Sequence, residues 1–395
     1  PMTRRHCRIH PFLPKSVATL FLLPASLIWS IHTAPLTIAQ SPTAALKTLQ
    51  QIEPGDAQIE KAVAAAGELQ TLPSGQLVEV LRAMDEATPL GRNWLSGIAS
   101  KLYGGNLEQH EPALQSFLRE TQHAGEARAL VFDWLTQSRP DLRTRLLDGM
   151  LEDPSPELRY ASIAQALEKV GEKPADLDEE GTKQRRLQLE PLLASARHPD
   201  QVNSLHKLLK DVGVELSPAK HFGFLQQWQV IGPFDNVGQK AFDVAYPVEA
   251  DLLTGLYNPQ QKYEGKKGEA NWQEATGNEE EGAVDLNPIY ANEKGAIVYA
   301  RAEFVAPAPL ECQVRLGCIN ANKVWVNGQL VLSNEVYHAS AQIDQYIGET
   351  ALKAGKNIIV VKVCQNEQTE PWAQNWAFQL RLCDATGKAI AAIAD

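Results

Sequence analysis

The chain has 395 residues, of which 44% are hydrophobic and 22% are charged, as in ordinary globular proteins. Acidic residues outnumber basic residues by 48 to 37, which gives a formal net charge of −11. This balance argues against the basic surface that nucleic-acid binding requires, so we expect no nucleic-acid partner. The length is sufficient for two or three domains, each with its own core.

The N-terminal residues 1–39 have the parts of a secretory signal peptide. A positive leader precedes an apolar run over residues 16–31, and a small-residue pattern that ends at Ala39 suits cleavage there. The alternative is a retained membrane anchor, but Pro24 interrupts the run, which is shorter than the roughly 20 residues that span a bilayer. We therefore expect an extracellular or periplasmic protein with no membrane span after signal removal.

Apolar residues recur at helical spacing over residues 43–216, and turn signals separate the helices. Short links between helices of this kind predict antiparallel pairs. Residues 152–167 resemble the turn and second helix of a HEAT-type repeat, in which Asp153 or Ser155 caps a helix that Pro156 begins. One clear unit leaves both a HEAT-like array and a generic α-helical array open. Either array offers a face to a protein partner.

Beyond residue 221 the pattern changes to alternating apolar and polar residues with turns of Gly, Pro and Asn. Residues 228–236 predict a strand that runs into a tight turn. The Asn327-Gly328 pair supplies the positive φ angles of a tight hairpin. Short strands with such turns predict a β-sandwich or jelly roll. Six later strands are predicted over residues 297–305, 312–319, 323–326, 329–332, 357–364 and 376–382.

The order of motifs at residues 299–304, 323–328, 352–363 and 376–381 resembles the galactose-binding-domain-like jelly roll. That fold stands beside the catalytic barrel of family 2 glycoside hydrolases and in many carbohydrate-binding modules. The resemblance rests on core and turn residues, so it implies a fold rather than a ligand. The opening segment at residues 228–236 and the insertion that follows it, up to about residue 292, are not part of the compact form of this module. The two-part layout also resembles exported bacterial proteins, which adds a location but no chemistry.

The expected fold class is therefore multidomain α plus β, with an α-helical (HEAT-like) array followed by an antiparallel β-sandwich or jelly roll. The expected parts are a signal peptide over 1–39, a helical repeat domain over 43–216 and a galactose-binding-like sandwich over 221–395. Cys312 and Cys318 alternate with apolar residues on one predicted strand, too far apart for a disulfide, so we interpret them as small buried hydrophobes.

No motif commits the chain to a reaction. A family 2 hydrolase carries its two catalytic carboxylates on a barrel, and no segment is left here to form one. The sequence also lacks a metalloprotease helix, a nucleophile elbow, a phosphate loop and a dinucleotide fingerprint. We therefore expect a non-catalytic protein with no cofactor. An enzyme with an unrecognised site at the domain junction is the least favoured alternative.

The polar loop over residues 365–376 is the best candidate for a binding site, because it combines amides, carboxylates and two indoles. Sugars are bound by this mixture: an aromatic face stacks on the ring, and polar groups bind the hydroxyls. The predicted ligand-binding residues are Asn366, Glu370, Trp372, Gln374 and Trp376, with Tyr337 and His338 at the same rim. The alternative is that Trp376 belongs to the core and Trp372 packs the loop down.

Asp235, Asn236 and Asp243 offer oxygen ligands for a structural calcium ion, although their spacing matches no calcium loop. The leading hypothesis is an exported accessory protein whose sandwich binds carbohydrate or a similar extracellular ligand. The alternative is a structural protein–protein interaction scaffold that has no small-molecule ligand.

Overall fold

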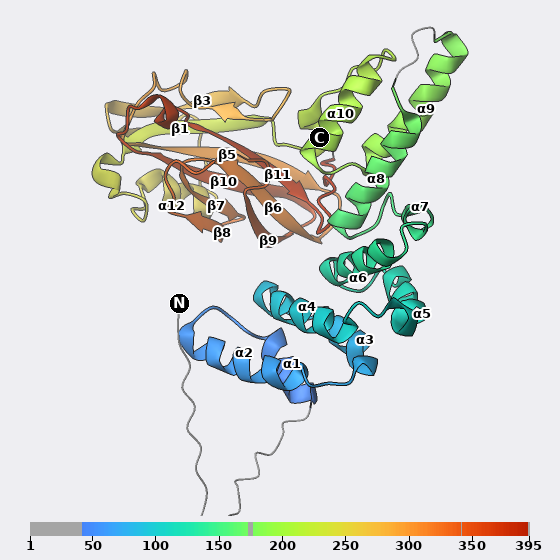
Figure 1. The fold of residues 1–395 in the computed structure, drawn as a ribbon. Helices are drawn as coiled ribbons and strands as arrows, with labels where there is room; N and C mark the ends of the chain where they lie inside the picture. Colours follow the sequence, from blue (N-terminus) through green and yellow to red (C-terminus); the bar gives the residue numbers. More distant parts are fainter. Residues whose placement is uncertain (1–41, 173–176, 341, 394–395) are drawn as a thin grey trace, which may run out of the picture. The chain divides into compact units, whose positions relative to one another are not determined.

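A computed structural model describes residues 42–172, 177–340 and 342–393, and the chain changes from helices to strands between Phe222 and Gln227. The expected fold class is confirmed, because a helical region precedes two antiparallel sheets (Figure 1). The predicted signal peptide lies outside the described residues. Within the described ranges, no helix has both the length and the apolar character that a membrane crossing needs.

Consecutive helices pack against each other, as α5 does against α6 and α9 against α10. Their apolar faces form one core between Ala45 and Leu158 and a second core between Ile163 and Phe224. The helices are α1 (Pro42–Gln50), α2 (Asp56–Leu69), α3 (Leu77–Arg82), α4 (Pro89–Tyr103), α5 (Leu107–Arg119), α6 (Gly125–Ser138), α7 (Leu142–Leu147), α8 (Pro156–Val170), α9 (Glu179–Ser195), α10 (Pro199–Lys210) and α11 (Pro218–Phe222).

The turn before α8 is capped by one of the two residues that the sequence predicted. Ser155 Oγ accepts a hydrogen bond from the Leu158 N–H, so Ser155 caps the helix that Pro156 begins. Asp153 instead accepts two hydrogen bonds, at 2.6 and 2.7 Å, from the guanidinium group of Arg128 on α6. This buried, bidentate ion pair fastens the turn to the neighbouring helix.

The β half is a sandwich of a seven-stranded sheet, in the order β2-β3-β1-β5-β10-β7-β8, and a four-stranded sheet, in the order β4-β11-β6-β9. The facing sides of the two sheets form one apolar core. The strands are β1 (Gln227–Asp235), β2 (Tyr263–Gly265), β3 (Gly268–Thr276), β4 (Val284–Asp285), β5 (Ala296–Ala306), β6 (Leu310–Cys318), β7 (Ala321–Val326), β8 (Gln329–Asn334), β9 (Tyr346–Leu352), β10 (Gly355–Gln365) and β11 (Ala377–Cys383).

Each of the six later predicted strands matches an observed strand, with ends that differ by at most two residues. The predicted hairpin joins β7 to β8, and Asn327 and Gly328 have φ angles of 50° and 81°. The sequence did not predict the short strands β2 and β4, nor the longer strands β3 and β9. Most residues of β3 and β9 are exposed or half-buried, so these strands lack the long apolar runs that mark β5 and β10.

The cysteines of the sandwich are packing residues, as the sequence indicated for Cys312 and Cys318. Cys312, Cys318, Cys364 and Cys383 are all buried and free. Burial raises the pKa of the Cys312 thiol to about 11 and that of the Cys318 thiol to about 12. These thiols therefore stay protonated and apolar near neutral pH.

The insertion between β1 and β2 covers the outer face of the seven-stranded sheet. Its helix α12 (Pro247–Thr254) packs Val248 and Leu252 into a cluster with Tyr299 and Trp325 of the sheet. Tyr299 lies on this face because β5 alternates, and the neighbouring Val298 points into the core between the sheets.

A closed polar cluster lies beneath this cover. Lys362 has a side chain only 1% exposed, and its Nζ donates to the carbonyls of Phe242 and Val244 at 2.9 and 2.7 Å. The same Nζ lies 3.3 Å from a carboxylate oxygen of Glu249, which also accepts a hydrogen bond from the Tyr299 hydroxyl at 2.7 Å. Phe242, Val244 and Glu249 belong to the insertion, whereas Lys362 and Tyr299 belong to the sheet. These hydrogen bonds therefore hold the insertion on the sheet.

Candidate functional site

Three loops of the sandwich meet at one rim, which we define as Asn236, Tyr337, His338, Asn366 and Trp372. They follow β1, β8 and β10. Asn236 is fully buried and ties them together: its Nδ2 donates to the Tyr337 hydroxyl at 3.0 Å and to the Gln365 carbonyl at 3.1 Å. Its Oδ1 accepts a hydrogen bond from the Ala241 N–H at 3.2 Å.

The phenol of Tyr337 is held in its neutral form. Burial raises its pKa to about 12, and this effect outweighs the hydrogen bond from Asn236, which acts in the opposite direction. That hydrogen bond uses the phenol oxygen as an acceptor and leaves the O–H of Tyr337 as a donor.

His338 and Trp372 form the outer part of the rim. Nε2 of His338 lies 2.9 Å from Oδ1 of Asn366, an amide oxygen that accepts a hydrogen bond. Nδ1 of His338 is buried and has no hydrogen-bond partner. The imidazole meets the indole of Trp372 edge to face, with ring centroids 5.0 Å apart, and 60% of Trp372 is exposed. The contact orients an aromatic surface that is open to solvent.

Glu370 and Gln374 lie on the same loop beside Trp372. Glu370 is exposed, and its carbonyl accepts a hydrogen bond from the side-chain amide of Gln374 at 3.1 Å. Gln374 therefore braces the loop with its amide hydrogens. Asn366 donates to the side-chain oxygen of Gln368 at 2.9 Å, so its amide is also engaged within the loop. The polar residues of the rim are fixed by one another.

Trp376 does not reach this rim. It is fully buried in the core between the sheets, with its ring centroid 5.8 Å from that of Tyr290. A ligand in solution has no access to such an indole. The alternative interpretation of the sequence, in which Trp376 is a core residue, describes its position, and we leave it out of the candidate site.

Two of the three residues predicted for calcium, Asn236 and Asp243, use their side chains in other contacts. Nζ of Lys323 lies 2.6 Å from Oδ1 of Asp243, and the amide of Asn236 holds the loops of the rim. The carbonyl of Asp235 accepts a hydrogen bond from the Tyr246 hydroxyl. Across the described ranges, no group of three His, Cys, Asp or Glu residues is placed to hold a metal ion.

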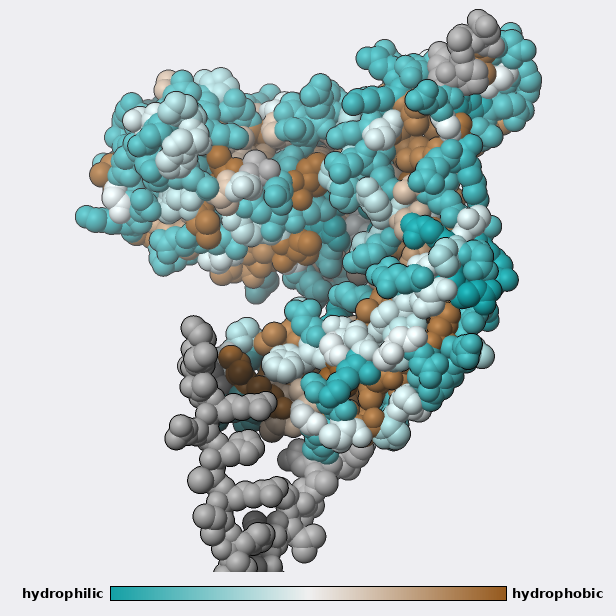
Figure 2. All heavy atoms as spheres, viewed as in Figure 1, coloured by the Kyte–Doolittle hydropathy of each residue, from teal (hydrophilic) through white to brown (hydrophobic). Residues whose placement is uncertain are grey.

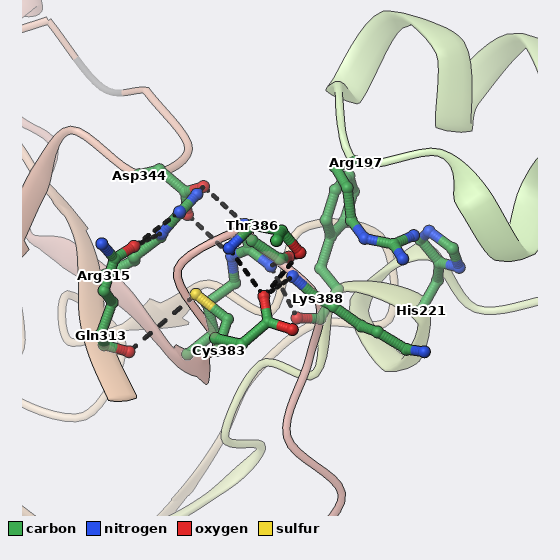
Figure 3. A network of polar contacts seen from close by, with 12 residues as sticks. Arg197, His221, Gln313, Arg315, Asp344, Cys383, Thr386 and Lys388 are labelled. Atoms are coloured by element: carbon green, nitrogen blue, oxygen red, sulfur yellow. Dashed lines mark hydrogen bonds and ion pairs between the residues drawn. The ribbon is translucent and has the colours of Figure 1, made fainter. Parts of the chain in front are cut away.

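A second polar network, which the sequence did not reveal, lies where the helices meet the sandwich (Figure 3). Asp344 accepts hydrogen bonds from Arg315 at 2.8 Å and from Nε of Arg381 at 2.7 Å. Arg381 also donates to the carbonyls of Phe222 in α11 and of Gly387. No local pattern could have indicated this network, because its members lie far apart in the sequence.

A third feature is a cavity of about 480 Å³ on the outer face of the seven-stranded sheet. The guanidinium group of Arg301 lies 4.0 Å from the ring centroid of Tyr257 and bonds to Glu303 at 2.6 Å. Tyr257 comes from the insertion, so the segment that departs from the compact module forms one wall of this cavity.

No family model matches this chain, and no curated protein matches it. Among solved structures, it is similar to a β-glucosidase from Kluyveromyces marxianus in complex with glucose, with 16% identity over 25% of this chain and a TM-score of 0.19. An anti-sigma factor domain-containing protein from Clostridium clariflavum is 11% identical over 43% of this chain, with a TM-score of 0.22. The chain spans 12% of the first protein and 45% of the second.

A DNA glycosylase, AlkC of Pseudomonas fluorescens, bound to DNA that contains an abasic site analog, is also similar. It is 11% identical over 90% of this chain and 96% of its own, with a TM-score of 0.19. TM-scores at this level carry no argument about activity or ligand.

Proposed function

We propose that this chain is an exported, non-catalytic accessory protein whose sandwich is of the galactose-binding type and binds a saccharide at the rim. The observation that carries the proposal is the exposed indole of Trp372, which His338 and Asn366 hold in a fixed orientation. An aromatic ring that is already oriented loses little conformational entropy when a sugar ring stacks on it.

The surroundings of Trp372 suit a neutral sugar. The exposed carboxylate of Glu370 accepts hydrogen bonds from hydroxyls, and the O–H of Tyr337 donates. The rim is built from loops that follow strands of a rigid sandwich, which is where binding residues are commonly found.

The test is isothermal titration of the full chain with a panel of neutral saccharides, together with thermal unfolding in their presence. A ligand that binds the native state raises the melting temperature by mass action. We expect a saccharide-specific rise that disappears in Trp372→Ala. Leu256→Ala is the matched control, because it removes another exposed apolar side chain of the sandwich. Binding that survives in Trp372→Ala, or the absence of binding across the panel, contradicts the proposal.

Export is part of the proposal and depends on residues 1–39. Cell fractionation with N-terminal sequencing tests this part. A mature protein outside the cytoplasm that begins at Gln40 supports it. A full-length protein found in the cytoplasm contradicts export without affecting the binding site.

A second candidate function is a protein–protein interaction scaffold. Hydrophobic residues gather on the side of the β half that carries β8 and β9 (Figure 2), where Leu330 and Ile347 are exposed on the edge strands. Sedimentation velocity over a range of concentrations tests this surface for a second copy of the chain. Self-association that Ile347→Lys abolishes supports this candidate, and a monomer at every concentration contradicts it in this form.

A further inference from the structure

A cavity of about 950 Å³ lies where α8, the turn between α9 and α10, and the sandwich come together. Three guanidinium groups line it, those of Arg159, Arg197 and Arg315. Figure 3 shows Arg197 on the helical side of this junction and Arg315 with Asp344 on the strand side. The cavity is separate from the rim around Trp372, since the two share no residue.

Arg159 and Arg197 are held mainly by carbonyl groups rather than by carboxylates. Arg159 donates to the carbonyls of Asp153 and Thr386 at 2.5 and 2.9 Å. Arg197 donates to the carbonyl of Ala196 at 3.0 Å, and its Nε is buried without a hydrogen-bond partner. Its nearest carboxylate is that of Glu152, 3.6 Å away on a side chain that is 62% exposed. Glu152 offsets part of the charge of Arg197, and the carboxylate of Asp384 acts in the same direction.

The two guanidinium groups also repel each other. Burial and the charge of Arg197 lower the pKa of Arg159 by more than the carboxylates of Glu152, Asp153 and Asp384 raise it. Burial likewise lowers the pKa of Arg197, although the charges of Glu152 and Asp384 act in the opposite direction; the charge of Arg381 adds a smaller lowering. Two partly desolvated cations that face one cavity are stabilised by an anion placed between them.

The carboxylates that line the cavity are engaged elsewhere. Asp344 is bound by Arg315 and Arg381, which hold its pKa below the usual range although burial alone would raise it. Glu157 accepts a hydrogen bond from Ser155, and Asp200 is 80% exposed and lies 3.8 Å from His198. None of these three makes an ion pair with Arg159 or Arg197 in the described part of the chain.

Two further features suit an organic anion. The helices α8 and α10 begin at Pro156 and Pro199, both of which line the cavity, and the N-terminus of a helix favours negative charge. The rings of Tyr160 and His198 meet edge to face on the wall, with centroids 5.0 Å apart. Because the two rings are nearly perpendicular, they form an aromatic corner against which the carbon body of a ligand can pack. The volume is that of a small-molecule site.

The geometry points to a second binding site in this cavity, for a small organic oxyanion whose negative group lies between Arg159 and Arg197 and whose body packs on Tyr160 and His198. The negative group is a carboxylate or a phosphate, since the fork of an arginine binds both. This site is independent of the saccharide site proposed at the rim, because no residue of the rim contributes to it.

The test is isothermal titration of the full chain with sodium glucuronate and with inorganic phosphate, at an ionic strength held constant with sodium chloride. Glucose is the neutral match for glucuronate. We expect glucuronate to bind and Arg197→Gln to weaken its affinity about tenfold or more, the effect of losing one charged hydrogen-bond donor. Phosphate that binds as tightly as glucuronate identifies a free oxyanion as the ligand. Binding of glucuronate alone identifies a carboxylate on a ring-sized body.

The matched control is Arg186→Gln. Arg186 lies on α9, donates to the Val212 carbonyl at 3.0 Å, has an unpartnered Nε and does not line the cavity. We expect this variant to bind glucuronate as the unmodified chain does. Arg197→Lys, which keeps the charge and loses the fork, gives an intermediate affinity and serves if the glutamine variant does not fold.

Two results would overturn the inference. One is that neither anion binds above the level of chloride. The other is that Arg186→Gln and Arg197→Gln weaken binding equally, which would mean that net charge rather than this cavity is responsible. Trp372→Ala separates the two sites: it is expected to abolish binding of neutral saccharide and to leave glucuronate binding at the cavity unchanged.

Discussion

Two tryptophans that are close in the sequence lie in opposite environments, one in the interior of the sandwich and one at its rim. Trp376 is fully buried between the sheets, whereas 60% of Trp372 is exposed beside His338. Polar groups show the same contrast. Lys362 and Glu249 are enclosed and satisfied by protein atoms, while the carboxylate of Glu370 faces solvent at the rim. The enclosed groups maintain the fold, and the open groups are available to a ligand.

The largest expected effect lies in the core. Trp376→Ala removes a fully buried indole and leaves a cavity, so we expect the free energy of unfolding to fall by about 4 kcal/mol. Urea denaturation followed by circular dichroism measures it. A loss of less than about 1 kcal/mol, the ordinary effect of a point substitution, would contradict the position of Trp376 between the sheets.

The closed polar cluster should respond almost as strongly. Glu249→Ala leaves the ammonium group of Lys362 buried without its counter-charge, so we expect a loss of about 3 kcal/mol. Glu264→Ala, at an exposed position on β2, is the control and should change stability little. If both substitutions change the free energy of unfolding equally in the same denaturation experiment, the polar cluster does not stabilise the packing of the insertion on the sheet.

The network at the junction should give a smaller effect. Asp344→Asn removes the counter-charge of Arg315 and Arg381, and we expect a loss of about 2 kcal/mol. The loss is limited because Arg381 keeps its hydrogen bonds to the carbonyls of Phe222 and Gly387. Thermal unfolding of the two proteins side by side measures it, and an unchanged stability would contradict the role assigned to Asp344.

The same network predicts a dependence on pH. Hydrogen bonds and charges from Arg381 and Arg315 lower the pKa of Asp344 in the folded protein, although burial alone would raise it. A lowered folded pKa means that the contribution to stability is complete above the unfolded carboxyl pKa of about 3.9 and is lost as the pH falls through the folded value. The stability difference between the unmodified chain and Asp344→Asn should therefore shrink below a pH of about 3.9. A constant difference would contradict this linkage.

The smallest effect on stability is expected at the rim. Trp372→Ala removes a largely exposed side chain, so we expect the free energy of unfolding to change by less than about 0.5 kcal/mol. Saccharide binding should nevertheless be lost. A loss of stability near that of Trp376→Ala would mean that Trp372 packs its loop down instead of binding a ligand.

The parts of the fold that could be predicted are those with local signals. Runs of apolar residues between turn signals located β5 and β10, and Asn327-Gly328 located the hairpin between β7 and β8. The helix α12 and the strands β3 and β9 were missed because their packing depends on contacts with distant segments. The same limit applied to Arg159 and Arg197, whose surroundings include Thr386 and the sandwich.

The candidate site was predicted in part. The sequence grouped Tyr337 and His338 with Asn366 and Trp372, and the structure brings these four side chains to one rim. The sequence could not tell which of Trp372 and Trp376 is exposed, because both belong to the same polar loop. Only the path of the chain into β11 buries the indole of Trp376.

The most direct test of a saccharide site at the rim is ¹⁹F NMR of the protein labelled with 5-fluorotryptophan, with the Trp372 resonance assigned from its absence in Trp372→Phe. Addition of a saccharide that binds should move this resonance, because the sugar would pack on the one strongly exposed indole in the described part of the chain. The Trp376 resonance should stay in place. If saccharide binds and the Trp372 resonance does not move, the site lies elsewhere and the central claim is wrong.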